Sequence, residues 1–434
     1  MTAFALTPEQ TARCAELRTL AADRLRPLAE KGEPGHVNRP LVAALGELGL
    51  LDALFEADEG SPGARGTARP APSDPQIRTA PSSEASRTLG LCLTRESLAY
   101  ACTEAETAFA LQGLGAHPVH THGSRAQRDR WLPPVRRGHA IAAFALSEPG
   151  AGSDAAALNL AATPAGSEGW RLTGEKCWIS NAPEADFYTV FARTSPGAGS
   201  RGVTAFLVPA DRAGLTGIPL DMLSPHPIGA LAFDGVRVTA ADVLGEVDRG
   251  FRVAMTTLNR FRPSVGAFAV GMAQAALDAT LAHTAERTAF GGPLKGLQAV
   301  AHQVAEMATR TEAARLMVYA AAAAYDREGP QAPGIARRAA MAKLIATETA
   351  QYVVDAAVQL HGARALRRGH LLEHLYREVR APRIYEGASE VQRTIIAKEL
   401  YAHTEGYAHT EGHAHKEGHA HKEPYATHPE EPPA

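Results

Sequence analysis

The chain has 434 residues, a length that predicts two or three packed domains. A hydrophobic fraction of 45%, a charged fraction of 21% and a net charge of −3 are typical of a soluble globular protein and give no sign of a nucleic-acid or acidic-membrane partner. No apolar run is long enough to cross a bilayer, no signal-peptide pattern opens the chain, and the four cysteines lack disulfide or metal spacing. We therefore expect a cytoplasmic protein without a membrane partner or a structural metal.

Residues 1–138 predict a mostly helical N-terminal domain. Apolar positions recur at helical spacing in four segments. Thr7 and Pro8 are suited to cap and begin the first segment, Pro27 is expected to kink or end it, and Gly49 stops the second. The four segments are residues 8–31, 39–48, 91–114 and 124–137.

Residues 57–87 interrupt this helical domain. They are rich in Gly, Pro, Ser and Ala and contain almost no core residues, so burial cannot offset the entropy lost on ordering. We expect a long mobile loop or an insertion, and we assign it no chemistry.

Residues 139–249 predict a small β-barrel or sandwich as the middle domain. Short apolar or alternating runs are separated by turn signals such as Asn181-Ala-Pro183, Ser195-Pro-Gly197 and Asp234-Gly235. The runs are residues 140–146, 170–173, 177–180, 187–192, 204–208, 230–233 and 236–238.

Residues 250–401 return to helical spacing and predict a C-terminal four-helix bundle. The whole chain is thus expected to have an α+β multidomain fold. The expected helical segments of this domain are residues 251–286, 296–328, 333–361, 371–380 and 389–401, with a loop at Phe290-Gly-Gly-Pro293.

Residues 402–434 repeat a six-residue unit without core residues, which favours a disordered polar tail. A second interpretation is weak metal or proton buffering by its imidazoles, although nothing in the repeat fixes a coordination geometry. The histidines are His403, His409, His413, His415, His419 and His421.

The turn from Phe144 to Asp154 combines glycines, serines and acids directly after a β run. Its backbone N–H groups, with the hydroxyls of Ser147 and Ser153, are suited to hold a nucleotide-like ligand, although such turns also occur as purely structural ones. Trp178 follows in Lys176-Cys-Trp-Ile-Ser-Asn181, where it either packs in the core or covers an aromatic cofactor.

Glu386 lies between Tyr385 and Gly387, among apolar and small residues. A carboxylate in such surroundings can be desolvated, which makes it a better base. A carboxylate at the start of a helix is the competing interpretation of the same local sequence.

Taken together, these motifs resemble the acyl-CoA dehydrogenase family over residues 8–400. Several separated segments carry the resemblance rather than one. They are Leu98-Ala-Tyr-Ala-Cys102, Leu146-Ser-Glu-Pro-Gly-Ala-Gly-Ser-Asp154, Lys176-Cys-Trp-Ile-Ser-Asn181, Arg262-Pro263, Arg287-Thr-Ala-Phe-Gly291, Gln298 and Ile384-Tyr-Glu-Gly-Ala-Ser-Glu-Val-Gln392.

The resemblance implies an FAD cofactor and an acyl-CoA substrate. Glu386 matches the catalytic base that removes the Cα proton, while flavin accepts the Cβ hydride and an electron-transfer flavoprotein takes the electrons. Part of each FAD site is contributed by a neighbouring subunit, which implies a homodimer or homotetramer. The implied FAD contacts are Leu146, Ser147, Gly152, Ser153, Trp178, Ser180, Arg287, Phe290, Gln298, Gln359, Gly362, Ala388 and Glu390. The implied substrate contacts are Ser153, Asn259, Arg262, Gly387 and Lys398.

Some positions depart from the family pattern. Asn259 stands where an Asp is frequent, Ala363 and Ala365 replace paired glycines, and Ala388 replaces a threonine. Two other functions remain open on the same fold: a flavin monooxygenase or oxidase, whose members usually lack the base that Glu386 matches, and a degenerate, non-catalytic member of the family.

Overall fold

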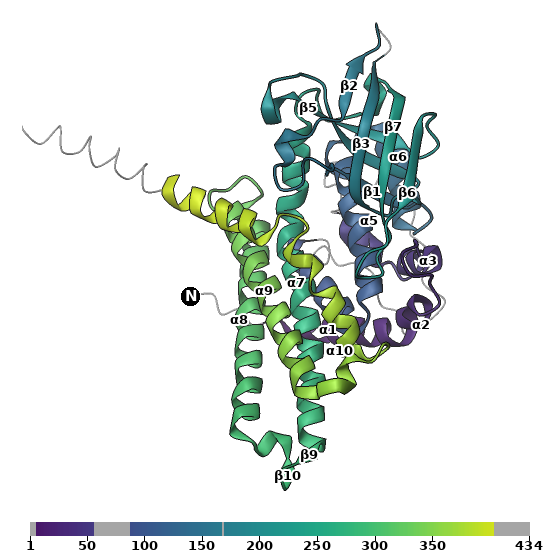
Figure 1. Ribbon diagram of the computed structural model, residues 1–434. Helices are drawn as coiled ribbons and strands as arrows, with labels where there is room; N and C mark the ends of the chain where they lie inside the picture. The colour runs from purple at the N-terminus through teal and green to yellow at the C-terminus, as the bar shows by residue number, and fades with distance from the viewer. Residues whose placement is uncertain (1–5, 56–86, 167–168, 403–434) are drawn as a thin grey trace, which may run out of the picture.

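The computed structural model describes residues 6–55, 87–166 and 169–402. The helical N-terminal part, the β-sheet and the C-terminal helices follow one another along the chain, and the sheet lies at one end of the helical bundle (Figure 1). The predicted α+β fold is confirmed. The expected loop at 57–87, except for Arg87, and the histidine-rich tail beyond Ala402 lie outside the described residues.

The N-terminal helices begin and end close to their predicted positions. Thr7 and Gln10 form a reciprocal capping box, and Gly49 adopts the left-handed conformation after the third helix. The helices are α1 (Pro8–Leu20), α2 (Arg26–Ala29), α3 (Arg39–Glu47), α4 (Thr88–Ala101), α5 (Thr103–His122) and α6 (Arg125–Arg136), with a π-helical turn at Ala21–Leu25.

Two predicted helices are divided. The segment 8–31 passes through a π-helical turn just before Pro27, which has no N–H to donate to the preceding turn. The segment 91–114 breaks at Cys102, whose backbone is extended (φ −159°, ψ 101°). Apolar spacing continued across this break because both helices bury a face, so the pattern predicted one helix where the chain forms two.

The described residues of the middle region form an eight-stranded mixed sheet with the order β6-β7-β3-β2-β4-β5-β8, and β1 pairs with β4. Runs 170–173 and 177–180 are one strand, as are 230–233 and 236–238, because β-bulges absorb the turn-like residues between them. The sequence did not predict β2, β6 or the short strand β8. The strands are β1 (Ala142–Ala145), β2 (Ala161–Pro164), β3 (Trp170–Ser180), β4 (Phe187–Arg193), β5 (Val203–Pro209), β6 (Leu215–Pro219), β7 (Ile228–Val238) and β8 (Val243–Leu244).

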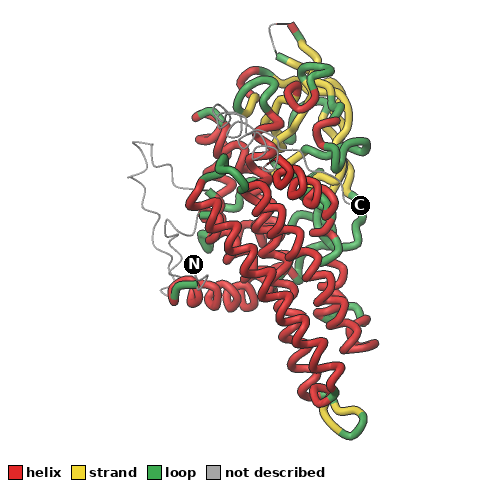
Figure 2. Tube along the Cα trace, turned by 90° about the vertical axis from the view of Figure 1, so that its left-hand side faces the viewer, coloured by secondary structure: helices red, strands yellow, loops and turns green. Residues whose placement is uncertain are grey.

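The C-terminal helices run along one another and end, away from the sheet, in a short hairpin (Figure 2). The predicted loop at Phe290 is this hairpin, whose strands β9 (Thr288–Ala289) and β10 (Gly292–Pro293) pair in antiparallel fashion. The helices are α7 (Gly250–Glu286), α8 (Gln298–Glu328), α9 (Ile335–His361) and α10 (Leu371–Glu378), followed by a helix over residues 389–402.

Helix α7 connects two apolar cores. Its first part, through Phe261, packs with the N-terminal helices and the sheet, and its later part, from Ala267, packs with α4, α8, α9 and α10. This helix is long and apolar enough to cross a membrane, but 72% of its most apolar window is buried within the protein. It is therefore a core helix, and the residues between Phe261 and Ala267 lie at the junction of the two cores.

Candidate active site and flavin site

Glu386 is held in a backbone conformation that few non-glycine residues adopt. Its φ is +51°, and that of Gly387 is +97°. The φ of Gly387 strains any residue with a side chain, and a Cβ atom there would also displace the Gln392 side-chain nitrogen, which would lie 2.4 Å away. Such strain persists only where the surrounding structure fixes the backbone, and it is frequent at functional sites.

Three buried donors fix the backbone here. Arg262 on α7 donates from Nε to the carbonyl oxygen of Glu386 at 3.2 Å. Lys343 on α9 and Gln392 each donate to the carbonyl oxygen of Gly387 at 2.8 Å. Asn259 accepts a hydrogen bond from Arg262 at 2.9 Å and thereby orients its guanidinium group. The backbone of the Glu386 segment is thus fixed from two helices.

The Glu386 carboxyl group is left free while its backbone is held. Its Oε2 atom is buried and has no hydrogen-bond partner among the described residues. Burial raises the pKa of Glu386 above its ordinary value, although Arg95, Lys343 and Arg262 act in the opposite direction. A desolvated carboxylate without a hydrogen-bond donor is chemically suited to accept a proton from a ligand.

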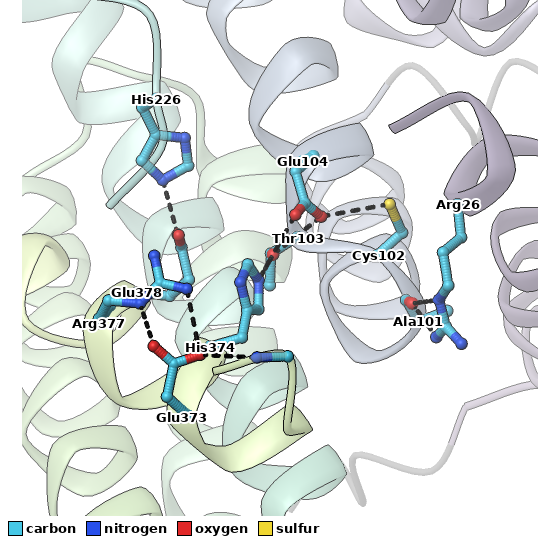
Figure 3. Close-up of polar contacts among 11 residues, drawn as sticks. Arg26, Ala101, Cys102, Thr103, Glu104, His226, Glu373, His374, Arg377 and Glu378 are labelled. Atoms are coloured by element: carbon cyan, nitrogen blue, oxygen red, sulfur yellow. Dashed lines mark hydrogen bonds and ion pairs between the residues drawn. The ribbon is translucent and has the colours of Figure 1, made fainter. Parts of the chain in front are cut away.

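A group of polar interactions holds α10, the helix that leads into this segment (Figure 3). His226, in the loop before β7, lies 2.6 Å from Glu378 at the end of α10, and both side chains are largely buried. Thr103 on α5 lies 2.6 Å from His374. These interactions connect α10 to the sheet domain and to α5, and so fix where the chain enters the Glu386 segment.

The far side of the segment is tied to α9 by Glu348. Arg383 lies 2.9 Å from one oxygen of this carboxylate, and Ser389 donates to the other at 2.6 Å. The remaining predicted residues here lie on or beside the helix over 389–402. Ala388 is part-buried, whereas Glu390, which pairs with Arg393, and Lys398 are exposed.

The turn after β1 is anchored by a buried ion pair. Lys176 on β3 is completely buried and donates at 2.8 Å both to the carbonyl oxygen of Leu146 and to Glu148. Glu148 also accepts from the backbone N–H groups of Asn159 and Leu160. The turn is therefore fixed on its inner side, and Gly152 and Ser153 lie exposed on its outer side.

Trp178 is presented next to this turn by a β-bulge. Its φ is +61°, and the pairing register of β3 shifts between Lys176 and Ile179. The N–H group of Cys177 donates to the carbonyl oxygen of Ser147 at 3.0 Å, which joins turn and strand. Trp178 is 55% exposed, so the interpretation of it as a core residue is wrong. Ser180 is part-buried on the same strand.

The other predicted FAD contacts lie at the hairpin end of the bundle. Arg287 and Phe290 belong to the hairpin, Gln298 begins α8, and all three are exposed, Phe290 to 91%. Gln359 and Gly362 lie exposed at the end of α9, next to the end of α7, where His361 stacks on His283 at 4.1 Å. Both views place this end far from the sheet (Figures 1 and 2). One chain therefore does not bring these residues to Trp178.

Comparisons with known proteins cover all three parts of the chain. Profiles of the acyl-CoA dehydrogenase N-terminal, middle and C-terminal domains match residues 82–139, 143–236 and 248–401. The chain is 32% identical over 388 residues to cyclohexane-1-carbonyl-CoA dehydrogenase of Geobacter metallireducens, covering 88% of this chain and 95% of that relative. The chain belongs to the acyl-CoA dehydrogenase family.

Solved structures extend the likeness to the whole fold. Butyryl-CoA dehydrogenase of Megasphaera elsdenii is 30% identical with a TM-score of 0.80, covering 92% of this chain and 100% of that one. A chain from a structure of the electron transferring flavoprotein of Acidaminococcus fermentans is also 30% identical with a TM-score of 0.80, covering 92% and 99%. This acyl-CoA dehydrogenase is an oxidoreductase of fatty acid metabolism and a flavoprotein that uses FAD.

The residues of the chain fit such a cofactor. The exposed indole of Trp178 provides a flat apolar surface, and a Cβ atom added at Gly152 or Gly362 would meet no other atom within 4 Å. The backbone is therefore open to a ligand at both the turn and the end of α9.

Sequence reasoning missed several buried groups at this site. Arg95 and Glu106 form a buried ion pair near Glu386, and Lys343 holds Gly387. For Arg95 and Lys343 the available signal was a charged residue within an apolar helix, since such residues are rarely fully buried without a partner. Glu106 stands in the first turn of α5, where an acidic residue is ordinary, so it gave no such signal.

Proposed function

We propose that this enzyme oxidises an acyl-CoA thioester to the trans-2-enoyl-CoA, with Glu386 as the base that removes the Cα proton. The observation that carries the proposal is the Glu386 carboxyl group, whose Oε2 is buried and unpaired among the described residues while Arg262 holds its backbone from α7. Proton removal next to a thioester requires a base of raised basicity in a dry site.

The chain's own groups define the rest of the site. When bound, FAD supplies the hydride acceptor, which no side chain provides. We assign Ser147, Ser153, Trp178 and Ser180 to its flavin end, with Leu146, Gly152, Ala388 and Glu390 nearby. The Glu386 backbone N–H makes no hydrogen bond within the described part of the chain and is suited to bind the thioester oxygen, where negative charge develops as the proton leaves. Asn259, Arg262, Gly387 and Lys398 are assigned to the substrate.

We further propose that the active enzyme is a homodimer or homotetramer. Arg287, Phe290, Gln298, Gln359 and Gly362 are exposed together at the hairpin end and lie away from Trp178 in the same chain. A second subunit that places this end over the first subunit's FAD would complete the site. Light scattering coupled to gel filtration tests this, and a monomeric, FAD-loaded and active enzyme would contradict it.

The proposed electron acceptor is an electron-transfer flavoprotein in the cytoplasm. The alternative acceptor is molecular oxygen, as in an oxidase or monooxygenase on the same fold. Rapid reoxidation of the substrate-reduced enzyme by air, with hydrogen peroxide as product, would favour the alternative. Slow reoxidation by air and fast reoxidation by an electron-transfer flavoprotein would support the proposal.

The decisive experiment on the base is the substitution Glu386→Gln. The variant should remain yellow with bound FAD, but a panel of short, branched and cyclic acyl-CoAs should no longer bleach its flavin. Glu306→Gln, which removes a half-exposed carboxylate from α8, is the matched control and should bleach like the wild type. Normal bleaching by Glu386→Gln would place the base on another residue.

A further inference from the structure

Three imidazole rings from three elements gather at the hairpin end of the bundle. His283 lies near the end of α7, His361 ends α9, and His370 caps the start of α10. The rings of His283 and His361 stack with their centroids 4.1 Å apart and their planes at 20°. The ring of His370 meets His361 edge-on at 5.8 Å. Stacked rings direct their nitrogen atoms side by side, so they do not converge on a metal ion.

Hydrogen bonds leave His283 as the ring best placed to take up a proton. The Nδ1 atom of His361 donates to the carbonyl oxygen of Ala357 at 2.8 Å, and this ring is only 6% exposed. His370 accepts the backbone N–H of Leu372 with its Nδ1 atom at 3.1 Å, which it can do only while that nitrogen is unprotonated. His283 is half-buried, and its ring nitrogens have no hydrogen bond within the described part of the chain. Two charged rings at 4.1 Å would repel each other, so the stack takes up a single proton.

Two arginines lie next to this stack. Arg287 follows α7, and its backbone N–H donates to the carbonyl oxygen of His283 at 2.8 Å. Arg364 belongs to the short 3-10 helix Gly362–Leu366, which directly follows α9. Both side chains are exposed and form no ion pair with a described residue. The two guanidinium groups are therefore available to an anionic ligand, for which a diphosphate is the best match because each of its phosphates can accept two parallel N–H bonds.

An anion bound to these arginines would change the charge around His283. Burial has the largest influence on the pKa of His283 and lowers it, and Arg364 and Arg287 lower it further. His370 acts in the same direction, and Glu286 acts in the opposite one. The ring is therefore neutral at neutral pH while no ligand is bound. A bound diphosphate would offset the two guanidinium charges and so favour the protonated ring.

We propose, on the basis of the proposed function, that His283 takes up a proton when the diphosphate of FAD binds beside Arg287 and Arg364. The FAD concerned is the one that the partner subunit binds at its flavin end. Gly362 leaves the backbone open to it, since a Cβ atom there would meet no other atom within 4 Å. Because binding takes up a proton, the affinity for FAD should rise as pH falls, until His283 is already charged in the free enzyme.

Equilibrium dialysis of the FAD-loaded, full-length enzyme against a series of FAD concentrations tests this at about pH 8 and about pH 6, on either side of the ordinary histidine pKa. The diphosphate of FAD does not titrate in this range. The wild type should bind FAD about three- to tenfold more tightly at the lower pH. An affinity that is constant, or that falls toward the lower pH, would overturn the inference.

Two variants assign the proton to His283. His283→Gln removes the titratable ring, and His283→Phe also keeps an aromatic side chain stacked on His361. Both should bind FAD equally at the two pH values, about as tightly as the wild type does at about pH 8. His139→Gln, at an exposed position before β1, is the matched control and should keep the wild-type pH dependence. Wild-type pH dependence in both His283 variants would refute the assignment.

Calorimetry of FAD binding to the full-length chain gives a measurement that needs no substitution. At about pH 6.5, buffers of different ionisation enthalpy should reveal an uptake of about half a proton to one proton per FAD. Release of protons, or no exchange, would contradict the inference. Flavin bleaching by acyl-CoAs is measured on FAD-saturated enzyme and tests the proposed function separately. Normal bleaching without proton uptake would therefore overturn this inference alone.

Discussion

The Glu386 segment and the hairpin end of the bundle hold their proposed site residues in opposite ways. Around Glu386, buried donors from α7 and α9 fix the backbone within one chain. At the hairpin end, Arg287 and Phe290 project from a short exposed hairpin. In the first region, contacts within one chain fix the backbone before any ligand binds. In the second region, the position of the exposed residues relative to a ligand depends on a neighbouring subunit. Substitutions in the two regions should therefore differ in kind.

The largest effect is expected at Lys343, which fixes the Glu386 segment. Lys343→Met removes the 2.8 Å hydrogen bond to Gly387, and a base displaced from its reacting position should slow flavin bleaching by about 100-fold. FAD content should remain unchanged. Stopped-flow bleaching at pH 7 is the appropriate measurement, because burial lowers the pKa of Lys343 to about 8 and the group is charged there. Lys31→Met, at an exposed position, is the control, and equal rates in both variants would contradict the assigned role.

The pH dependence of flavin bleaching should reflect the protonation of the Glu386 carboxyl group. Burial raises the pKa of Glu386 above 4.5, so the base becomes protonated as pH falls through this raised value. The bleaching rate should therefore fall by about tenfold per pH unit below that point and be constant above it until other groups titrate. A rate that is independent of pH down to 4.5 would show that Glu386 is not the base.

Arg287 tests the exposed region. If its guanidinium group binds FAD across subunits, Arg287→Ala should weaken FAD binding by about tenfold, or about 1.4 kcal/mol, without changing bleaching of the fully loaded enzyme. FAD titration of the apoprotein measures this. Arg327→Ala, an exposed arginine at the other end of α8, should bind FAD like the wild type. Equal FAD affinity in both variants would remove Arg287 from the site.

A substitution of His226 tests whether its ion pair with Glu378 stabilises the position of α10. It should have the smallest effect of the four changes. Burial opposes charge on His226, but Glu378 outweighs it and raises the pKa of His226 above 6.5, while His226 in turn lowers the pKa of Glu378 below 4.5. The stability that His226 contributes to the fold is complete below pH 6.5 and is lost as pH rises through the raised pKa of His226. The stability that Glu378 contributes is lost as pH falls below 4.5. His226→Asn should therefore destabilise the fold most between about pH 5 and 6.5, by about 1 kcal/mol.

Urea unfolding of the wild type and of His226→Asn at several pH values measures this difference. It should shrink as pH rises above 6.5. A difference that grows toward alkaline pH would mean that the pair is not ionic. His302→Asn, a change at an exposed position on α8, provides the control.

Much of the fold was predictable because its signals are local. The cap at Thr7 and the helical spacing of α7 to α9 depend on residues a few positions apart. The errors arose where distant residues decide. Asp234 and Gly235 have the sequence of a turn, yet pairing with β3 keeps them within one strand. Cys102 breaks a pattern that remains apolar because α4 and α5 each bury a face in the core.

The sequence by itself made the turn at Ser147, Trp178 and Glu386 candidates for the site, because each stands in a compact motif. Only the tertiary structure decided that Trp178 faces outward through a bulge. It also decided that Glu386 has a left-handed backbone and a buried oxygen without a hydrogen-bond partner in the described part of the chain. The physical reason is that burial and electrostatic environment depend on helices far apart in the chain. No local window of residues contains the groups that desolvate a carboxylate or pair with it.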